Sequence, residues 1–343
     1  MQAGVITGQR RLELVEVSEP EPAADGVVVA VDHCGICGSD VHAYRSGRPY
    51  SPALCGHEWA GTIAAVGREA GGWSEGDRVV VAVPPACGHC GACRAGQADH
   101  CVTVFLASLA LDVAVPVSGG FAPRIAVAAG RVLRAHPGLT AVEAAQVEPT
   151  TVAFHAVRRS GVRLGDVAVV QGAGPIGLTT LQWARAAGAA EVLVVEPNAE
   201  RRALATVLGA TTVVTPDLAA QHVLERTHGL GADVVYECAG RPDAVQSAVD
   251  LARRGGRVCL IGVIDGDAPV NPLVWLVKEI SVVASLAYTH EEFDRVMGMI
   301  VDGRVRLEAI HSTTVGLDRL GEAFAALTDG APGLVKVLVD PNA

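Results

Sequence analysis

Four cysteines in the stretch CGHCGACRAGQADHC have the spacing of a metal site: Cys87, Cys90, Cys93 and Cys101. Two-residue gaps let thiolates surround one ion, and four sulfurs leave no open coordination position. We therefore predict a structural Zn²⁺ site in residues 87–101, with no room for a substrate. The alternative is a disulfide pair with spare thiols, which needs a secretory context that the sequence does not indicate.

A second motif, GAGPIG, follows an apolar run at residues 167–170. Its glycines let the backbone approach a pyrophosphate at the start of a helix. Another apolar run, residues 192–195, ends at Glu196, where a carboxylate can accept hydrogen bonds from the adenosine ribose. The alternative is a glycine-rich turn that only packs a helix on a strand. The residues predicted at a bound dinucleotide are Gly172, Gly174, Pro175, Ile176, Gly177, Glu196 and Arg201.

The alternation of strands and helices continues beyond this motif. Helices are predicted at residues 199–208 and 242–251, and buried strands at 212–214, 234–237 and 258–261. Such alternation over about 130 residues predicts a doubly wound parallel sheet of the α/β class.

The parts on either side of this sheet differ from it. Residues 1–150 are rich in valine and glycine and show few helical periods, which predicts a β-rich domain. After residue 286 the pattern indicates one or two helices and a last strand at 335–339. That tail is too short to fold alone, so we expect it to pack on the first domain.

The composition narrows the function classes. The chain has 343 residues, half of them hydrophobic, and a formal net charge of −10 with no basic block. Nucleic acid is an unsuitable partner, because phosphate contacts need clustered lysine and arginine. The sequence shows no signal peptide and no apolar run that could cross a bilayer. We therefore expect a cytoplasmic globular enzyme without a membrane partner.

Two further segments carry side chains that bind metals. Cys37 lies in HCGICGSDVHAY, residues 33–44, and His57 and Glu58 lie in CGHEWAG, residues 55–61. Thiolate and imidazole suit zinc. Each residue alone would more often be a packing residue, but their combination with an independent zinc motif and a dinucleotide fold favours a second zinc site.

These motifs, with VEPTTVAFHAV at 147–157 and ECAG at 237–240, resemble the zinc-dependent medium-chain dehydrogenase/reductase superfamily over nearly the whole chain. The resemblance is closest to the polyol, butanediol and threonine dehydrogenase branch, because residues 147–149 read Val-Glu-Pro. It implies a GroES-like β-rich catalytic domain at 1–152 that contains the zinc loop 87–101. It also implies an NAD-binding Rossmann domain at 153–285 and a C-terminal segment, 286–343, that returns to the catalytic domain.

The resemblance assigns the second metal site residue by residue. Cys37 and His57 match catalytic zinc ligands, Glu148 matches the third protein ligand, and Glu58 matches a neighbouring carboxylate that can replace Glu148 or a bound water. One thiolate, one carboxylate and a neutral imidazole balance the charge of Zn²⁺, so Glu58 is expected to exchange or to stay outside the ligand set. The alternative is that Glu148 only precedes a structural proline turn.

Three residues near Cys37 complete the implied site. Asp40 matches a position that hydrogen-bonds the histidine ligand and fixes its tautomer. Ser39 is expected near the substrate oxygen, and His42 is expected to pass the proton to solvent. His42 could instead be a surface histidine at the start of a helix.

The resemblance implies a zinc-dependent oxidoreductase that transfers a hydride between a secondary alcohol or polyol, or the corresponding ketone, and NAD. Two zinc ions per chain are expected, and Glu196 favours NAD over NADP because a carboxylate repels a 2′-phosphate. The apolar run 280–286 predicts a homo-oligomer, a tetramer or a dimer.

The alternatives are a zinc-free enone or quinone reductase of the same fold and a non-catalytic nucleotide-binding protein. A thiol redox switch that uses the cysteine loop is a third. Residues 105–127 are longer and more apolar than the family pattern, so the identity of the substrate is not carried over.

Overall fold

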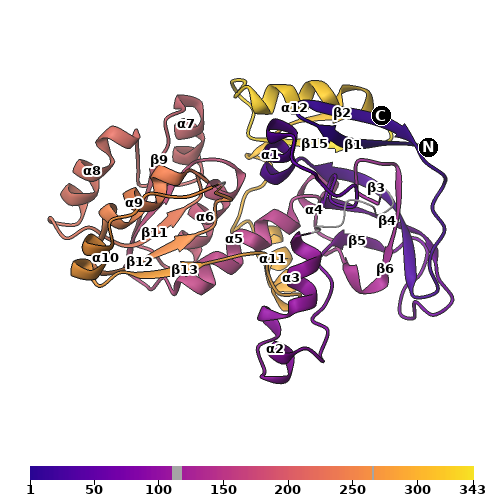
Figure 1. The fold of residues 1–343 in the computed structure, drawn as a ribbon, viewed down its shortest axis with the longest axis horizontal. Helices are drawn as coiled ribbons and strands as arrows, with labels where there is room; N and C mark the ends of the chain where they lie inside the picture. Colours follow the sequence, from indigo (N-terminus) through magenta and orange to yellow (C-terminus); the bar gives the residue numbers. More distant parts are fainter. Residues whose placement is uncertain (110–117, 265) are drawn as a thin grey trace. The chain divides into compact units, whose positions relative to one another are not determined.

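The computed structural model describes residues 1–109, 118–264 and 266–343, which form two compact units (Figure 1). The first unit comprises residues 1–148, 288–301 and 311–343. The second comprises residues 149–287 and 302–310. Part of the apolar segment 105–127, namely residues 110–117, lies outside the described residues.

The first unit is built on β-sheets. Its larger sheet follows the order β14-β15-β3-β4-β5-β7, with β6 paired to β3, and β1 and β2 form a separate hairpin. The C-terminal strands β14 and β15 belong to this sheet, and β15 lies beside the N-terminal strand β3 (Figure 1). The strands are β1 (Gln2–Gly8), β2 (Arg11–Glu16), β3 (Gly26–Gly35), β4 (Glu58–Val66), β5 (Arg78–Val81), β6 (Arg124–Ala128), β7 (Val132–Arg134), β14 (His311–Gly316) and β15 (Lys336–Asp340).

Short helices connect and flank these strands: α1 (Gly38–Ser46), α2 (Gly91–Arg94), η1 (Ala98–His100), α3 (Val102–Leu109), η2 (Ala129–Arg131), α4 (Ala141–Ala144), α11 (Glu291–Val301), η4 (Leu317–Arg319) and α12 (Leu320–Thr328). The core of this unit is continuous from the N-terminal strands to α12. Phe324 of α12 packs edge-to-face on Phe121 and lies 5.8 Å from it between ring centroids. Residues 288–301 and 311–343 of the C-terminal segment therefore belong to the first unit.

The second unit holds a six-stranded, all-parallel sheet in the order β10-β9-β8-β11-β12-β13. Numbered along the chain, this is the order 3-2-1-4-5-6 of the doubly wound dinucleotide-binding fold. The strands are β8 (Val167–Gln171), β9 (Glu191–Val195), β10 (Thr212–Val214), β11 (Ala232–Glu237), β12 (Ala252–Leu260) and β13 (Ser281–Ala284). The predicted α/β class with a parallel sheet is confirmed.

The helices of this unit are α5 (Val147–Ser160), which begins in the first unit, α6 (Pro175–Ala186), α7 (Ala199–Val207), η3 (Pro216–Leu218), α8 (Ala219–Arg226), α9 (Pro242–Leu251) and α10 (Pro272–Lys278). Residues 302–310 group with this unit, whereas the sequence places them in the returning segment. The reason is a set of contacts from Arg306, whose backbone N–H donates to Gln182 Oε1 at 2.8 Å and whose guanidinium donates to the Val207 carbonyl. Among the described residues, no helix is long and apolar enough to cross a membrane.

Candidate active site

Cys37 stands at the junction between a strand and a helix. Strand β3 ends at Gly35, and Cys37 is the N-cap of α1. The Asp40 carboxylate accepts a hydrogen bond from the Cys37 backbone N–H at 3.0 Å, which closes the first turn of α1. An N-cap of this kind fixes the direction of the Cys37 side chain, since the first helical turn is locked behind it.

His57 and Glu58 lie where the neighbouring strand begins. Strand β4 starts at Glu58, which pairs with Gly35 at the end of β3. The sheet register therefore brings His57 and Glu58 to the end of β3 where Cys37 lies. One ligand atom from each of Cys37, His57 and Glu58 lies within 4.8 Å of the others.

The His57 ring is oriented by its Nδ1 atom. Nδ1 lies 2.9 Å from the Leu54 carbonyl, which accepts the Nδ1 proton and leaves the Nε2 lone pair for a metal. The Asp40 carboxylate lies 3.6 Å from Nδ1, so its contact is electrostatic and the predicted hydrogen bond is not made. The reason is that Asp40 already accepts hydrogen bonds from Cys37 and from the Tyr50 hydroxyl, the latter at 2.8 Å.

The charges around His57 suit a cation. Burial lowers the pKa of His57, but the Asp40 carboxylate and the Cys37 sulfur raise it, and the net pKa is well above its ordinary value. A protonated imidazole is thus favoured where no metal is bound, because the surrounding groups are anionic. A soft thiolate, an imidazole and carboxylates in this arrangement fit Zn²⁺ in an open site.

Glu148 belongs to the same unit, and its carboxylate is hydrogen-bonded to the Tyr288 hydroxyl. It begins α5, and burial raises the pKa of its carboxyl to about 7, with Glu58 adding to the rise. The Tyr288 hydroxyl donates a hydrogen bond to Glu148 and accepts one from the Val83 backbone N–H at 3.2 Å. Glu148 is close enough to His57 and Glu58 to affect their charges, but it lies outside the tight cluster that Cys37, His57 and Glu58 form.

The two residues predicted for proton transfer lie on α1. Ser39 Oγ is 3.4 Å from His57 Nε2, which places the hydroxyl beside the ring nitrogen that would bind a metal. His42 lies one turn further along, and its Nδ1 is 3.3 Å from the Arg45 guanidinium. Ser39 therefore lies at the cluster of candidate metal ligands, whereas the contact that His42 makes with Arg45 lies on the surface of α1.

Two residues of the C-terminal part of the first unit were missed by the sequence analysis. Lys336, at the start of β15, is 2% exposed and forms an ion pair with Glu58. Tyr288 precedes α11, and its hydroxyl donates a hydrogen bond to the Glu148 carboxylate. Neither stands in a motif, and each meets its partner only because the chain returns to the first unit. The predicted last strand, 335–339, contains Lys336, but its pairing with β3 appears only in the structure.

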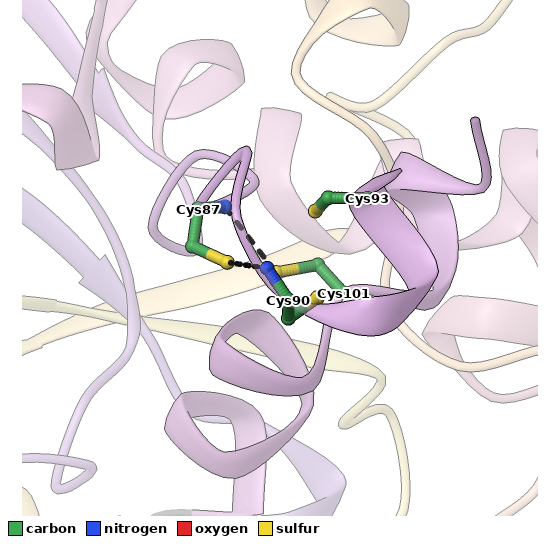
Figure 2. Close-up of side chains that lie close together, drawn as sticks. All are labelled: Cys87, Cys90, Cys93 and Cys101. Atoms are coloured by element: carbon green, nitrogen blue, oxygen red, sulfur yellow. Dashed lines mark hydrogen bonds between the residues drawn. The ribbon is translucent and has the colours of Figure 1, made fainter. Parts of the chain in front are cut away.

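The four cysteines of the loop 87–101 converge as predicted (Figure 2). Cys90 caps α2, and Cys101 directly precedes α3. Backbone N–H groups point at the sulfurs: Cys87 N lies 3.3 Å from Cys101 Sγ, and Cys90 N lies 3.3 Å from Cys87 Sγ. Hydrogen bonds, first that of Thr103, lower the pKa of Cys87 to about 5.

Hydrogen bonds also lower the pKa of Cys101, first that from the Cys87 backbone, so both residues favour the thiolate, the form that binds metal. Burial instead raises the pKa of Cys93 to about 12, so this thiol loses its proton only when a cation binds. All nine cysteines of the chain are free in this structure, which gives the disulfide alternative no support. An all-sulfur cage whose ligand atoms lie within 4.8 Å of one another fits one Zn²⁺ with no open position.

The glycine motif of the second unit forms the turn from β8 into α6. Gly172 has φ +91°, in the left-handed region, and a Cβ on Gly177 would collide with the Gly172 carbonyl. Gly174 is the N-cap of α6, with Pro175 and Ile176 in its first turn. The turn is thus one that glycine permits and that larger residues would block.

Glu196 reaches back to this turn from the end of β9. Its Oε2 accepts a hydrogen bond from the Ala173 N–H at 2.7 Å, and its Oε1 accepts one from the Asn198 N–H at 2.9 Å. Arg201 lies in the first turn of α7, where its N–H donates to Asn198 Oδ1. The neighbouring residue Arg202, rather than Arg201, has its guanidinium at the end of β9, where it donates a hydrogen bond to the Glu196 carbonyl at 2.8 Å.

Known proteins match both units. Residues 23–137 match the alcohol dehydrogenase GroES-like domain, and residues 175–302 match the zinc-binding dehydrogenase family. The 2-dehydro-3-deoxy-L-galactonate 5-dehydrogenase of Pseudoalteromonas atlantica is 34% identical over 100% of this chain and 99% of its own length. The sorbitol dehydrogenase of Bacillus subtilis is 31% identical over 100% and 98%.

The chain belongs to the zinc-dependent medium-chain dehydrogenase/reductase family.

Solved structures of family members agree over the whole length. A zinc-binding dehydrogenase from Sinorhizobium meliloti, bound to NADP, has a TM-score of 0.86 and 30% identity, covering 99% of each chain. An alcohol dehydrogenase from Escherichia coli, complexed with NADH, has a TM-score of 0.86 and 28% identity, again covering 99% of each chain. The GroES-like and Rossmann-like architecture is confirmed, and the protein is an oxidoreductase of the zinc-type alcohol dehydrogenase family. The zinc-free reductase and the non-catalytic protein are not supported.

Proposed function

We propose that this protein is an NAD-dependent enzyme with two zinc ions per chain that oxidises a secondary alcohol or polyol, or reduces the corresponding ketone. The observation that carries the proposal is the convergence of Cys37, His57 and Glu58 within 4.8 Å, with Glu148 in electrostatic contact. A closed four-cysteine cage stands in the same unit, and a glycine turn with Glu196 stands in the other.

Cys37, His57 and one of the two glutamates would hold the catalytic zinc. A zinc ion bound there would supply a Lewis acid that lowers the pKa of the substrate alcohol. Ser39 orients the substrate hydroxyl and accepts its proton, because its Oγ lies beside His57 Nε2. His42, one turn further along α1 and beside Arg45, passes that proton to solvent. Asp40 keeps α1 and Tyr50 in place behind these groups.

The second unit would bind the dinucleotide at the glycine turn. NAD would supply the hydride acceptor. The residues in contact would be Gly172, Gly174, Pro175, Ile176, Gly177 and Glu196, with Arg201 close by. Glu196 supports NAD over NADP, since its carboxylate is fixed by two backbone N–H groups and cannot turn away from a 2′-phosphate.

The four-cysteine loop would hold the second zinc, in a structural role. Its four sulfurs would form a complete tetrahedral ligand set, so no position is left for a substrate. Backbone N–H groups donate hydrogen bonds to two of these sulfurs, those of Cys87 and Cys101. Nine free cysteines also support a reducing, cytoplasmic location.

We further propose that the protein is a homo-oligomer, a tetramer or a dimer. Strand β13 is the last strand of its sheet, and Val282 on it is 38% exposed. Large apolar side chains are also exposed on helix α10 and in the segments that follow β12 and β13: Leu273 and Val263 at 65%, Leu276 at 74%, Val277 at 63% and Leu286 at 60%. An apolar edge of this kind is a site for a second copy. Light scattering that gives a monomer at micromolar concentration would contradict it.

A substrate and cofactor panel tests the proposal. The purified enzyme is offered secondary alcohols and polyols with NAD⁺ and with NADP⁺, and the reduced cofactor is followed by its absorbance. We expect turnover of at least one polyol, with the higher kcat/KM for NAD⁺, and elemental analysis close to two zinc ions per chain. Protein with both metals that turns over no alcohol or ketone would overturn the activity. Equal kcat/KM with both cofactors would overturn the choice of NAD.

A further inference from the structure

One half-buried arginine of the first unit makes no ion pair with any described residue. Arg131 is the last residue of η2, directly before β7. Its Nε donates a hydrogen bond to the Ala82 carbonyl at 3.3 Å. Among the described residues this is the one hydrogen bond of the guanidinium, and no carboxylate oxygen lies within 4.0 Å of it. The N–H donors of both terminal nitrogens are therefore unused.

Neighbouring arginines of the same sheet do have carboxylate partners. Arg124 on β6 pairs with Glu19 at 3.3 Å, and Arg134 at the end of β7 pairs with Asp77 at 2.6 Å. The side chains of these two arginines are 53% and 57% exposed, so water could solvate them even without a partner. Arg131 is the more buried residue, and a guanidinium removed from water normally has an anion beside it.

Arg131 is held at the candidate active site by two consecutive peptide groups. The Ala82 backbone N–H donates to the Arg131 carbonyl at 2.8 Å, and the Arg131 side chain returns to the Ala82 carbonyl. The next residue, Val83, donates its N–H to the Tyr288 hydroxyl at 3.2 Å, and this hydroxyl donates to Glu148. Burial lowers the pKa of Arg131, and the charges of Tyr288 and Glu148 oppose this effect. The guanidinium thus lies at the same corner of the site as Glu148.

Glu148 does not neutralise Arg131 once the site is loaded. Its carboxylate accepts the hydrogen bond of the Tyr288 hydroxyl, and it is one of the two carboxylates available to the catalytic zinc. A dication bound nearby is the largest local charge and offsets the negative charge of the carboxylates. Arg131 then has no counter-ion in the protein, so an anion brought in by a ligand gains most at this corner when the metal is present.

The unused edge of the guanidinium has the geometry of an anion receptor. With Nε engaged, the two terminal nitrogens present a planar pair of donors, which matches two oxygens of one carboxylate or phosphate. A hydroxyl of a neutral polyol offers a single oxygen and no charge, so it would leave the guanidinium uncompensated. The corner therefore favours a substrate that carries an anionic group.

We propose that Arg131 is a specificity-determining residue that binds an anionic group, a carboxylate or a phosphate, on the substrate. The proposal rests on the proposed function and narrows its substrate class from alcohols and polyols in general to aldonates or polyol phosphates. Arg131 binds the anionic end of such a substrate, while the hydroxyl that is oxidised lies at Cys37 and His57.

The first test compares substrates that differ in one end group. The full-length, zinc-loaded enzyme is offered a panel of polyols with NAD⁺, each beside its matching aldonate and its matching polyol phosphate. We expect kcat/KM for at least one anion to exceed that of the best neutral polyol about 100-fold, the scale of a charge-assisted bidentate contact. The anion that is preferred identifies the group as carboxylate or phosphate.

Variants locate the effect at Arg131. In Arg131→Gln, KM for the preferred anion should rise about 100-fold with little change in kcat, because a contact with a remote group is lost equally from the ground state and the transition state. For neutral polyols, kcat/KM should stay within about threefold. Arg131→Lys keeps the charge without the planar pair of donors and should lie between the two. Arg134→Gln is the matched control and should change neither value, since Arg134 already pairs with Asp77.

A calorimetric titration gives a readout that does not depend on turnover. The anion is titrated into enzyme that holds NADH, which cannot accept a hydride, so that only binding is measured. The Kd should rise about 100-fold in Arg131→Gln and stay at the wild-type value in Arg134→Gln. The Tm of ligand-free Arg131→Gln should equal or exceed that of the wild type, because the substitution removes a guanidinium that has no ion pair. If Arg131→Gln does not fold, Arg131→Lys and the wild-type panel decide.

The outcomes separate the two proposals. A wild-type enzyme that turns over neutral polyols at least as well as every matched anion would overturn the inference and leave the proposed function intact. Equal losses for neutral and anionic substrates in Arg131→Gln would do the same, because Arg131 would then serve only the fold or the charge of Glu148. Zinc-loaded protein that turns over no alcohol or ketone would overturn the proposed function. The titration would then decide the inference by itself, and anion binding that does not depend on Arg131 would overturn it as well.

Discussion

The two candidate zinc sites of the first unit differ in how the chain brings their ligands together. The four-cysteine cage comes from one continuous segment, residues 87–101, and needs only its own turns and the starts of α2 and α3. The Cys37 site takes residues from the end of β3, the start of β4, the start of α5 and the last strand, β15. One site can form when its loop folds, whereas the other exists only when the whole unit has folded.

This difference predicts that the four-cysteine site contributes to stability and the Cys37 site to catalysis. A closed local site ties a loop together and contributes folding free energy, because its ligands are not arranged before the metal binds. An open site assembled by sheet register places its ligands in advance and leaves room for a substrate. Removing a ligand from each site should therefore produce different failures.

The largest effect is expected for Cys37→Ser. Turnover should fall about a thousandfold or more, since a Lewis acid supplies several kcal/mol of transition-state stabilisation. The fold and NAD⁺ binding should persist, because the core of the second unit does not include this residue. Turnover, zinc content and cofactor affinity measured together check this. A Cys37→Ser enzyme that stays active would mean that the two sites have been assigned the wrong way round.

Cys93→Ser should instead reduce stability. Loss of the closed site should lower the Tm by about 10 °C, taking ~3 kcal/mol for a lost metal ligand set and about 3 °C per kcal/mol for a unit of this size. Turnover should fall only as the protein unfolds or dissociates. Cys238→Ser is the control, since this thiol lies in the second unit, where it contacts the Thr180 hydroxyl at 3.9 Å. A Cys93→Ser protein that is folded and assembled but inactive would contradict the purely structural role of the four-cysteine site.

Much of this architecture is predictable from sequence, for a physical reason. The parallel strands β8 and β9 each contain a continuous apolar run, residues 167–170 and 192–195, which is typical of a buried strand. The glycine turn and the cysteine cage are contiguous motifs. Their interacting residues are neighbours along the chain, so the spacing already indicates the geometry. Helix α9 begins at Pro242, where the predicted helix begins, because proline suits the first helical turn.

The rest depends on contacts that spacing does not encode. Lys336 is 278 residues from Glu58, and only the register of β15 on β3 and of β3 on β4 brings them together. The hydrogen bond from Tyr288 to Glu148 has the same origin. The predicted bond from Asp40 to His57 failed because the Leu54 carbonyl and the Tyr50 hydroxyl, neither in a recognised motif, took the positions at the two groups.

Chelation should separate the two metals in time. A chelator should remove the zinc of the open Cys37 site first, with loss of activity and an unchanged circular dichroism spectrum. The all-sulfur zinc should leave later, together with a fall in Tm, because its cage offers no open position for the chelator. Zinc release, turnover and Tm followed on one sample check the order. Activity that survives the loss of the first zinc ion would contradict the assignment of the open site.

The smallest effect is expected at the edge of the open site, for His42→Ala. His42 lies on α1 beside Arg45 and one turn beyond Ser39, so its role is to pass a proton outward rather than to touch the reacting carbon. A relay to solvent can be replaced by water, so kcat should fall about tenfold or less, below the 10²–10⁴ typical of a positioned general base. The loss should be greatest at low pH, where solvent is the poorest proton acceptor.

A deuterated alcohol gives the decisive readout. If proton release becomes limiting in His42→Ala, the isotope effect on kcat should shrink while zinc content and Tm stay at wild-type values. His222→Ala, on the surface helix α8, should change none of these. An unchanged isotope effect and pH profile would show that His42 is only a surface histidine, and that the proton leaves the site by another route.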